Sequence, residues 1–317
     1  MKISSLSAVL IGAVATPAMG CDLCAIYSAT QARGEGGQGP FLGLAEQFTH
    51  FGTLQDEGRE VPNQTGQYLN SSISQVFAGY NLTERFGLQF NLPIIYRSFK
   101  RPDGMGGIDR GTESGLGEIS LLGSFVGYRS LTEQSTFSWS VLGGVKFPTG
   151  STDRLKEELH EVQNPVGQPS GIHGHDLTLG TGSFDGIVGT GIYARWKRVF
   201  LTANTQYAIR STGDIDYQFA NDLTWFGGPG VYAVLSHKCT LAVLAVVSGE
   251  YKDQDTFRGG KADDTGVTAV YLGPQLSFTW SAKLSAEIGA DFPVSIANTS
   301  LQAVPDYRVR GGLTWRF

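Results

Sequence analysis

The stretch that decides the fold is "FSWSVLGGVKF", which runs from Phe137 to Phe147. Apolar residues alternate along it with small or polar ones. One face would carry Phe137, Trp139, Val141, Val145 and Phe147, and the other Ser138, Ser140, Gly144 and Lys146. Successive side chains of a strand point to opposite faces, whereas a helix needs apolar residues three and four positions apart. This stretch is therefore predicted to be a strand with one apolar and one polar face.

The same period of two recurs along the chain, for example in "FGLQFNLP" (86–93), "VFLTANTQYAIR" (199–210) and "LSAEIGADF" (284–292). The predicted strands are long compared with the roughly 5–6 residues typical of strands in soluble proteins. The pattern predicts an all-β chain with twelve strands, at residues 41–51, 67–80, 84–96, 115–128, 136–147, 185–196, 199–210, 222–235, 240–251, 265–280, 283–293 and 305–317.

The composition favours a membrane β-barrel over a helical membrane protein. Of the 317 residues, 41% are hydrophobic, only 17% are charged, and 43 are glycine. No apolar run beyond the N-terminus is long enough for a transmembrane helix, and a barrel needs none because its strands alternate. The formal net charge of −5 argues against a nucleic-acid partner, which usually requires a basic surface.

The connections between the predicted strands alternate between short and long. The long ones include 52–66, 97–114, 148–184, 252–264 and 294–304. Tryptophans fall near strand ends, where an interfacial girdle requires them: Trp139, Trp196, Trp225, Trp280 and Trp315. Prolines recur at the expected outer ends of strands, at Pro93, Pro148 and Pro293. Together these features predict a transmembrane antiparallel up-and-down β-barrel of about 12 strands, residues 41–317, in the lipid of a bacterial outer membrane.

The N-terminus has the pattern of a secretory signal peptide, predicted at residues 1–20. Lys2 supplies a positive charge, residues 6–14 form a short apolar run, and residues 18–20 form a small-x-small cleavage site. The chain is therefore expected to be exported. Residues 21–40 are predicted to form a periplasmic N-terminal segment.

That segment begins with "CDLCA", which places Cys21 and Cys24 three positions apart. Ala25 stands where a c-type haem motif requires histidine, which argues against covalent haem, and no other cofactor is predicted. We predict a disulfide between Cys21 and Cys24 in the oxidising periplasm. Three alternatives stay open: a lipid anchor on Cys21, a zinc cluster of both cysteines with His237 and Cys239, and no role for the pair.

If the apolar face of each strand meets lipid, the polar face lines the lumen. On the last two predicted strands, acidic and basic side chains would then face each other inside the barrel. The fourth predicted strand adds one acidic side chain and the fifth adds one basic side chain. The lumen candidates are Arg308, Arg310, Arg316, Glu287, Asp291, Glu118 and Lys146. These residues could form a structural lattice of ion pairs that fills the barrel, or a charged constriction that selects small solutes.

The longest connection contains "HGHD", in which His173, His175 and Asp176 could ligate a metal. Histidines in loops are also commonly just solvated, and no metal is assigned. The chain has no G-x-S-x-G, H-E-x-x-H or phosphate-loop motif, and no catalytic residue or enzymatic activity is predicted.

Three glycine-rich stretches carry a resemblance to a known family: "GLGEISLLGSF" (115–125), "GGVKFPTGS" (143–151) and "LGTGSFDGIVG" (179–189). They resemble Gram-negative outer-membrane β-barrels of the transporter-like, "MetA-pathway of phenol degradation" family. The terminal strand, ending at Phe317, also resembles the assembly signal of bacterial outer-membrane barrels. The resemblance implies uptake of small, often hydrophobic or aromatic compounds, and it supplies no catalytic residues.

The predicted function is therefore a channel that passes small solutes through a narrow, charge-lined lumen. The alternative is a non-conducting barrel that scaffolds a periplasmic redox or metal-binding partner through its C-x-x-C end.

Overall fold

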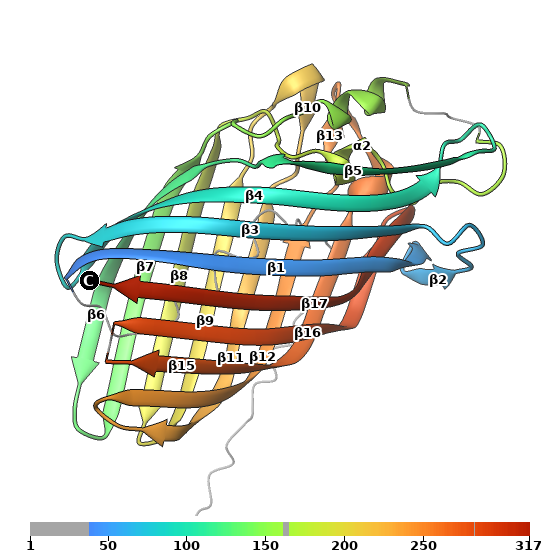
Figure 1. Ribbon diagram of the computed structural model, residues 1–317. Coiled ribbons are helices and arrows are strands. Elements are labelled where there is room, and N and C mark those ends of the chain that lie inside the picture. Colours follow the sequence, from blue (N-terminus) through green and yellow to red (C-terminus); the bar gives the residue numbers. More distant parts are fainter. Residues whose placement is uncertain (1–37, 161–164, 282) are drawn as a thin grey trace, which may run out of the picture.

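The computed structural model describes residues 38–160, 165–281 and 283–317, in which long antiparallel strands form a closed 12-strand barrel (Figure 1). The first half of the barrel comprises β1 (Gly39–Asp56), β3 (Tyr68–Asn81), β4 (Phe86–Pro102), β6 (Ser120–Leu131), β7 (Ser135–Lys146) and β8 (Asp185–Trp196). The second half comprises β9 (Val199–Ile209), β11 (Asp222–Leu235), β12 (Cys239–Lys252), β15 (Val267–Trp280), β16 (Leu284–Asn298) and β17 (Leu301–Arg316). The predicted fold class is confirmed.

Each barrel strand pairs with the barrel strands before and after it in the chain, and β17 pairs with β1 to close the ring. Short strands lie outside the ring: β2 (Arg59–Val61), β5 (Ile108–Leu116), β10 (Tyr217–Gln218), β13 (Thr256–Phe257) and β14 (Gly260–Lys261). The helical turns are η2 (Arg154–His160), α2 (Gly174–Leu177), η3 (Asp214–Asp216) and η4 (Asp263–Thr265). None of the helices in the described residues has the length and apolarity needed to cross a membrane.

Burial follows the period of two, as β17 shows. Tyr307, Val309, Leu313 and Trp315 are exposed on the outer face, while Arg308, Arg310 and Thr314 are buried on the inner face. An apolar exterior with buried polar groups inside is the reverse of a soluble barrel, and it suits lipid contact. The polar face of the alternation therefore lines the lumen.

The two ends of the barrel differ. At the turn end, the connections span 82–85, 132–134, 197–198, 236–238 and 281–283. At the loop end, they span 57–67, 103–119, 147–184, 210–221, 253–266 and 299–300. Near the turn end lie the exposed side chains of Trp139, Trp196, Trp280 and Trp315, whereas Trp225 lies near the loop end of β11.

One expected loop is absent. Residues 294–304 were predicted to connect the last two strands, but β16 runs to Asn298 and β17 begins at Leu301. Pro293 and Pro305 lie within these strands, at irregularities in the pairing register. Proline lacks the N–H that a regular ladder needs, and a bulge accommodates it without ending the strand. The interpretation of Pro293 as a strand end was therefore wrong.

A second correction concerns β4 and the predicted strand at 115–128. Pro93 lies inside β4, at the point where pairing with β6 gives way to pairing with β5. The predicted strand is divided, because β5 ends at Leu116 and β6 begins at Ser120. Here the Gly117 N–H donates to the Pro93 carbonyl at 2.9 Å. Pro93 has no backbone N–H to donate, and it lies where β4 changes its partner strand from β6 to β5.

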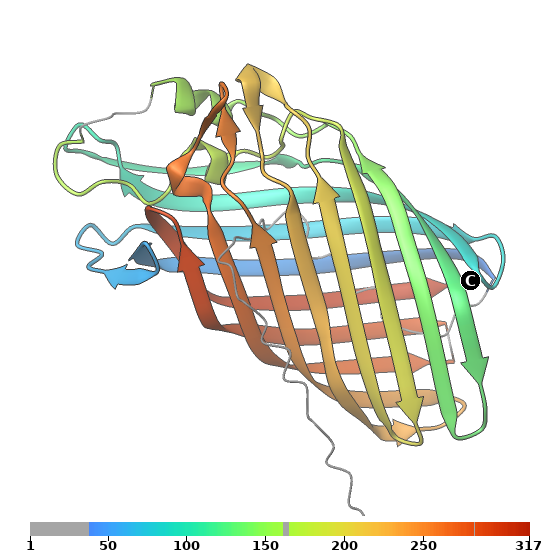
Figure 2. The same ribbon diagram turned by 180° about the vertical axis from the view of Figure 1, so that it is seen from behind.

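Three loops pack together over the loop end, and we call them the cap: residues 147–160 with 165–184, residues 210–221 and residues 253–266. The elements α2, β10 and β13 mark the cap in Figure 1, and Figure 2 shows the same end from behind. Leu155, Tyr217 and Phe219 form a buried apolar cluster among these loops. Ile172 and Leu177 are almost completely buried against inward side chains of the barrel wall. The cap therefore extends into the mouth of the lumen.

Candidate functional site

The first group of lumen charges lies on β15, β16 and β17. Arg310 donates from Nε to Asp291 Oδ2 at 2.6 Å and from Nη2 to Asp291 Oδ1 at 2.8 Å. Its Nη1 donates to Gln275 Oε1 at 3.0 Å, and its guanidinium lies 4.6 Å from the ring centroid of Phe226. The two-point pairing fixes the plane of the guanidinium, so Arg310 is held rigidly against the wall.

Arg308 is held in a different way, by a contact that reaches over two neighbouring strands of the wall. Its Nη2 donates to Glu250 Oε1 on β12 at 3.1 Å, although two strands separate β12 from β17. The Tyr271 hydroxyl donates to the same carboxylate at 2.9 Å, and the Arg308 guanidinium lies 4.5 Å above the Tyr271 ring. Glu250 was not singled out from the sequence. The alternation along β12 could have identified it, because Glu250 lies two and four positions after Ser248 and Val246, which are buried on the inner face.

Glu287 and Arg316 lie closer to the turn end than this pair. Glu287 accepts a hydrogen bond from Gln275 Nε2 at 3.2 Å, and Arg316 Nη1 donates to Ser285 Oγ at 3.1 Å. Both side chains are less buried than Arg308 and Arg310.

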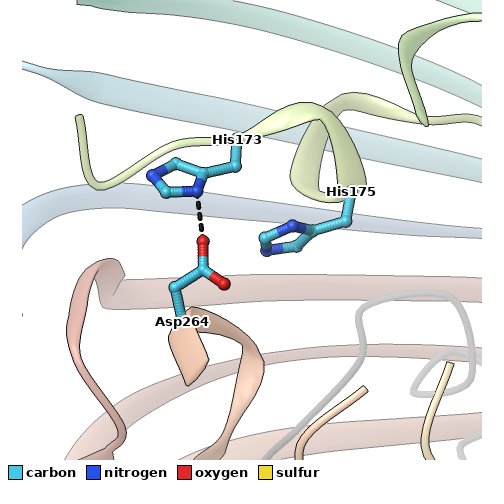
Figure 3. A group of neighbouring side chains, drawn as sticks. All are labelled: His173, His175 and Asp264. Carbon is cyan, nitrogen blue, oxygen red and sulfur yellow. Dashed lines mark ion pairs between the residues drawn. The ribbon is translucent and has the colours of Figure 1, made fainter. Parts of the chain in front are cut away.

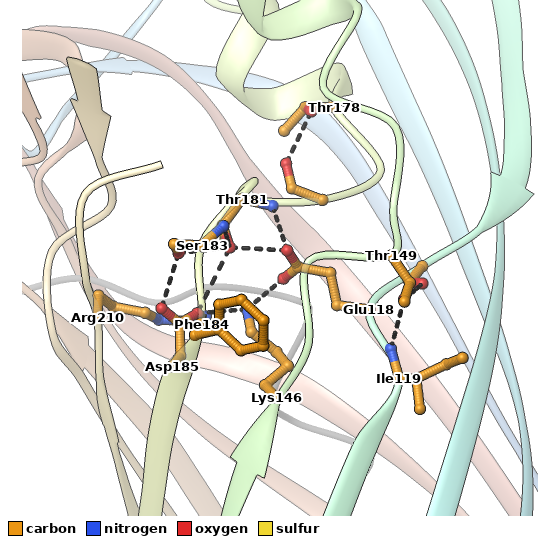
Figure 4. Close-up of polar contacts among 12 residues, drawn as sticks. Glu118, Ile119, Lys146, Thr149, Thr178, Thr181, Ser183, Phe184, Asp185 and Arg210 are labelled. Carbon is orange, nitrogen blue, oxygen red and sulfur yellow. Dashed lines mark hydrogen bonds and ion pairs between the residues drawn. The ribbon is translucent and has the colours of Figure 1, made fainter. Parts of the chain in front are cut away.

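A second group of charges lies on the opposite strands, at the loop ends of β7, β8, β9 and β11 (Figure 4). Lys146 pairs with Glu118 and with Asp185 Oδ2, the latter at 2.7 Å. Arg210 Nη1 donates to Asp185 Oδ2 at 2.9 Å, and Arg210 also pairs with Asp222. These five side chains are at most 5% exposed. Removing one member of such a group would leave a buried charge without its counter-charge.

This second group also anchors the cap. The Thr181 N–H and hydroxyl donate to Glu118 Oε1 at 2.6 and 2.7 Å, and the Ser183 hydroxyl donates to Asp185 at 2.8 Å (Figure 4). Gly150 and Gly180 allow the two arms of the longest loop to cross closely. A Cβ added to Gly180 would lie 2.8 Å from the Gly150 Cα. The path of the loop into the lumen is therefore set by polar anchors and by glycine.

The third part of the wall, on β1, β3 and β4, has one charged side chain among its buried inward residues, Arg97 of β4, which donates to the Thr178 carbonyl of the cap. Its buried inward side chains include Ala45, Gln47, Ile73, Gln75, Phe77 and Ile95. Leu179 of the cap packs against the apolar members of this set. The lumen thus has two charged sides and one mostly neutral, partly apolar side, in which Arg97 lies next to the cap.

Two cavities adjoin inside the barrel. The larger, of ≈ 100 Å³, lies beneath the cap and is lined by cap residues such as Ile172 and by Arg97 and Lys252 of the wall. The smaller, of ≈ 20 Å³, lies deeper and is lined by Phe226, Asp291 and Arg310, among others. Glu250 and Arg308 line both cavities. The Arg308–Glu250 ion pair therefore stands between them.

The cap contains the predicted loop histidines. His175 Nδ1 lies 3.1 Å from Glu158 Oε1, its Nε2 lies 3.5 Å from Asp176 Oδ2, and its ring stacks on Tyr217. Burial opposes protonation, but the charges of Asp176 and Glu158 outweigh it and raise the pKa of His175 to about 10. His175 is therefore a buried cation at neutral pH in the absence of a competing ligand.

His173 pairs through Nδ1 with Asp264, which comes from the loop between β14 and β15 (Figure 3). Burial would raise the pKa of Asp264, but the hydrogen bond from His173 and the charge of His175 hold it well below its ordinary value. Ligand atoms of His173, His175 and Asp264 lie within 4.8 Å of one another. The sequence grouped the histidines with Asp176 and missed Asp264, which lies far along the chain.

Several polar side chains of β1 and β3 lie on the outer face of the barrel. Glu46, midway along β1, is exposed on the outer face, where Ser72 and Ser74 of β3 donate hydrogen bonds to its carboxylate. Closer to the loop end on the same face, His50 Nδ1 lies 2.6 Å from Asn70 Oδ1. An ionisable group facing lipid is costly, and the alternation of β1 did not lead us to single it out.

The predicted cysteine sites fall mostly outside the described residues. The predicted signal peptide, Cys21, Cys24 and their predicted disulfide all lie in residues 1–37, outside the described residues. Cys239 lies at the turn end, at the start of β12, where its N–H donates to Ser236 Oγ at 3.1 Å and its Sγ lies 3.7 Å from the same hydroxyl.

A scan against protein-family models gave no match, and a search of curated proteins gave none either. Among solved structures, the chain is similar to the COG4313 outer membrane channel from Pseudomonas putida F1. The identity is 16%, the match covers 89% of this chain and 96% of that chain, and the TM-score is 0.63. This likeness shows a shared barrel fold.

More distant matches include the transport unit of the autotransporter AIDA-I from Escherichia coli, at 9% identity with coverage of 93% and 95% and a TM-score of 0.47. The P. putida toluene transporter TodX matches at 8% identity, with coverage of 88% and 90% and a TM-score of 0.41.

Proposed function

We propose that this protein is an outer-membrane channel that passes small solutes through a narrow lumen, with the Arg308–Glu250 ion pair as its constriction. The observation that carries the proposal is the position of this pair between two adjoining cavities inside a closed barrel. The apolar exterior supports residence in lipid, since a closed barrel satisfies every backbone group within the bilayer.

The arrangement of the wall supports a route for solutes that are small and partly apolar. The charged groups are paired with one another on two sides of the lumen, which limits the field that they exert on a passing ion. The side formed by β1, β3 and β4 offers Ile73, Phe77 and Ile95 instead. We place the solute path through the two cavities, where Phe51 and Leu69 of this side line the larger one and Gln47 lines the smaller one.

The seven lumen residues proposed from the sequence then have different roles. Arg308 contacts the route directly at the constriction. Arg310 with Asp291, and Lys146 with Glu118, hold the wall and the cap in position. Glu287 and Arg316 line the approach from the turn end, which we place in the periplasm.

The first experiment is single-channel recording of the purified protein in planar bilayers in 1 M KCl. Steady conductance, altered by Arg308→Gln, supports the channel and its constriction. The matched control is Lys238→Gln, a change in a short turn at the rim of the turn end. If correctly folded protein inserts into liposomes without conducting ions or releasing small entrapped solutes, the proposal is refuted.

A further inference from the structure

The cap holds a cluster of metal-ligating side chains that the channel does not need. His173 and His175 flank the start of α2 in one loop, and Asp264 lies in η4 of another loop (Figure 3). All three side chains are buried or nearly so, with 15% exposure for His173, 6% for His175 and 19% for Asp264. Two imidazoles and a carboxylate at one buried point form the kind of nitrogen and oxygen set that binds zinc.

The hydrogen bonds around the rings direct the remaining nitrogens into the cluster. His173 Nε2 lies 2.8 Å from the Ser170 carbonyl, which can only accept, so Nε2 is the donor and Nδ1 faces Asp264. His175 Nδ1 likewise lies 3.1 Å from the Glu158 carboxylate. Metal-binding histidines characteristically donate their second ring nitrogen to a carbonyl or carboxylate in this way.

A further carboxylate, that of Asp176, lies beside His175 but outside the group whose ligand atoms are all within 4.8 Å of one another. Asp176 Oδ2 lies 3.5 Å from His175 Nε2 and accepts a hydrogen bond from the His173 N–H at 2.9 Å. Ligands at bond lengths of about 2.0–2.1 Å around a tetrahedral zinc stand about 3.4 Å apart. The separation between Asp176 and His175 therefore already matches that of two ligands sharing one ion.

We propose that His173, His175 and Asp264, with Asp176 as a fourth ligand, form a binding site for a divalent transition metal of the zinc class. The nitrogen ligands disfavour Mg²⁺ and Ca²⁺, which prefer an all-oxygen set. Because the ligands come from two loops of the cap, the ion fastens residues 165–184 to residues 253–266. The metal is thus a latch that holds the cap over the lumen, and this last step rests on the proposed channel function.

Binding is tested first, without reference to conductance. The full chain is purified in detergent without an affinity tag and with serine at every cysteine, which removes thiol ligands at Cys21, Cys24 and Cys239. Isothermal titration with ZnCl₂ should show saturable binding of one ion per chain. MgCl₂ at the same concentrations should give no saturable signal.

Variants then assign the ligands. Asp264→Asn and His173→Ala should each weaken zinc binding by about tenfold or more, since each removes a direct ligand. The matched controls are His160→Ala and His237→Ala, exposed histidines outside the cluster, and these should bind as wild type does. Circular dichroism and the shift of the folded barrel on electrophoresis check that every variant folds. Absence of saturable zinc binding, or equal weakening by the control variants, overturns the site.

The latch is tested separately in planar bilayers. Zinc should reduce the conductance of wild type at concentrations that saturate the site, and it should leave Asp264→Asn unaffected. Equal block of both proteins would refute the latch while leaving the binding site intact. If neither protein conducts although zinc binds stoichiometrically, the channel proposal fails and the metal site stands.

Discussion

Replacing Glu250 with glutamine should make the lumen selective for anions. The substitution keeps the size of the side chain and an oxygen that can accept from the Tyr271 hydroxyl, which donates to Glu250 at 2.9 Å. It removes the negative charge that now lies 3.1 Å from Arg308 Nη2. Arg308 lines both cavities, so its uncompensated charge would act on every ion passing between them.

The size of the effect follows from Coulomb's law. An ion that passes about 5 Å from the guanidinium in a water-like medium gains or loses about 0.8 kcal/mol. The charge attracts an anion and repels a cation, so the difference between the two is about 1.7 kcal/mol. A difference of about 1.4 kcal/mol corresponds to a factor of ten. The chloride-to-potassium permeability ratio of Glu250→Gln should therefore rise by about 10- to 20-fold over wild type.

The assay is the reversal potential of planar-bilayer currents under a KCl gradient. The control is the double variant Glu250→Gln/Arg308→Gln, which has a lumen of similar size without the charge, and it should return to the wild-type ratio. An unchanged ratio in the single variant, with conductance intact, would refute the position of this pair at the constriction. A shift toward potassium would contradict the electrostatic reasoning itself.

Three further outcomes are expected. Asp291→Asn should lower the free energy of unfolding by about 3–5 kcal/mol, because Arg310 stays buried without its counter-charge; an unchanged urea midpoint of the barrel in lipid vesicles would contradict this. Gly180→Val should raise single-channel conductance several-fold, because its side chain would clash with Gly150 and displace the cap; wild-type conductance would show that the cap does not restrict the lumen. Glu46→Leu should stabilise the barrel by about 1 kcal/mol, since it replaces a carboxylate facing lipid with an apolar group; a lower urea midpoint would instead assign the carboxylate a structural role.

The strands could be predicted from the sequence because the same alternation of apolar and polar residues recurs in every strand of the barrel wall. Each strand must present apolar side chains to lipid and polar ones to the lumen, so the alternation marks the strand directly. The ends of strands obey no such rule. Pro93, Pro293 and Pro305 look like terminators, but in the structure each lies at a bulge or a change of partner within a longer strand.

The contacts of the candidate site were harder to predict from the sequence, because they join segments that lie far apart in the chain. The alternation predicts that Arg310 and Asp291 face inward from neighbouring strands, and their pairing follows from that. It cannot predict that Arg308 reaches Glu250 across two strands, since this depends on the curvature of the closed barrel. Asp264 contacts His173 only because their two loops pack against each other. The packing of loops produces no repeating pattern of residues from which it could be predicted.

The pairing of β1 with β17 has a consequence for biogenesis. The ring is closed by contacts between the most widely separated strands, running from Phe41 opposite Arg316 to Asp56 opposite Leu301. Such non-local pairings form slowly, because a long stretch of chain must be ordered before they can stabilise it. Until they form, the nascent sheet exposes two unsatisfied edges that would template aggregation in water. We therefore expect that the edges of β1 and β17 must be shielded from other chains until the two strands pair.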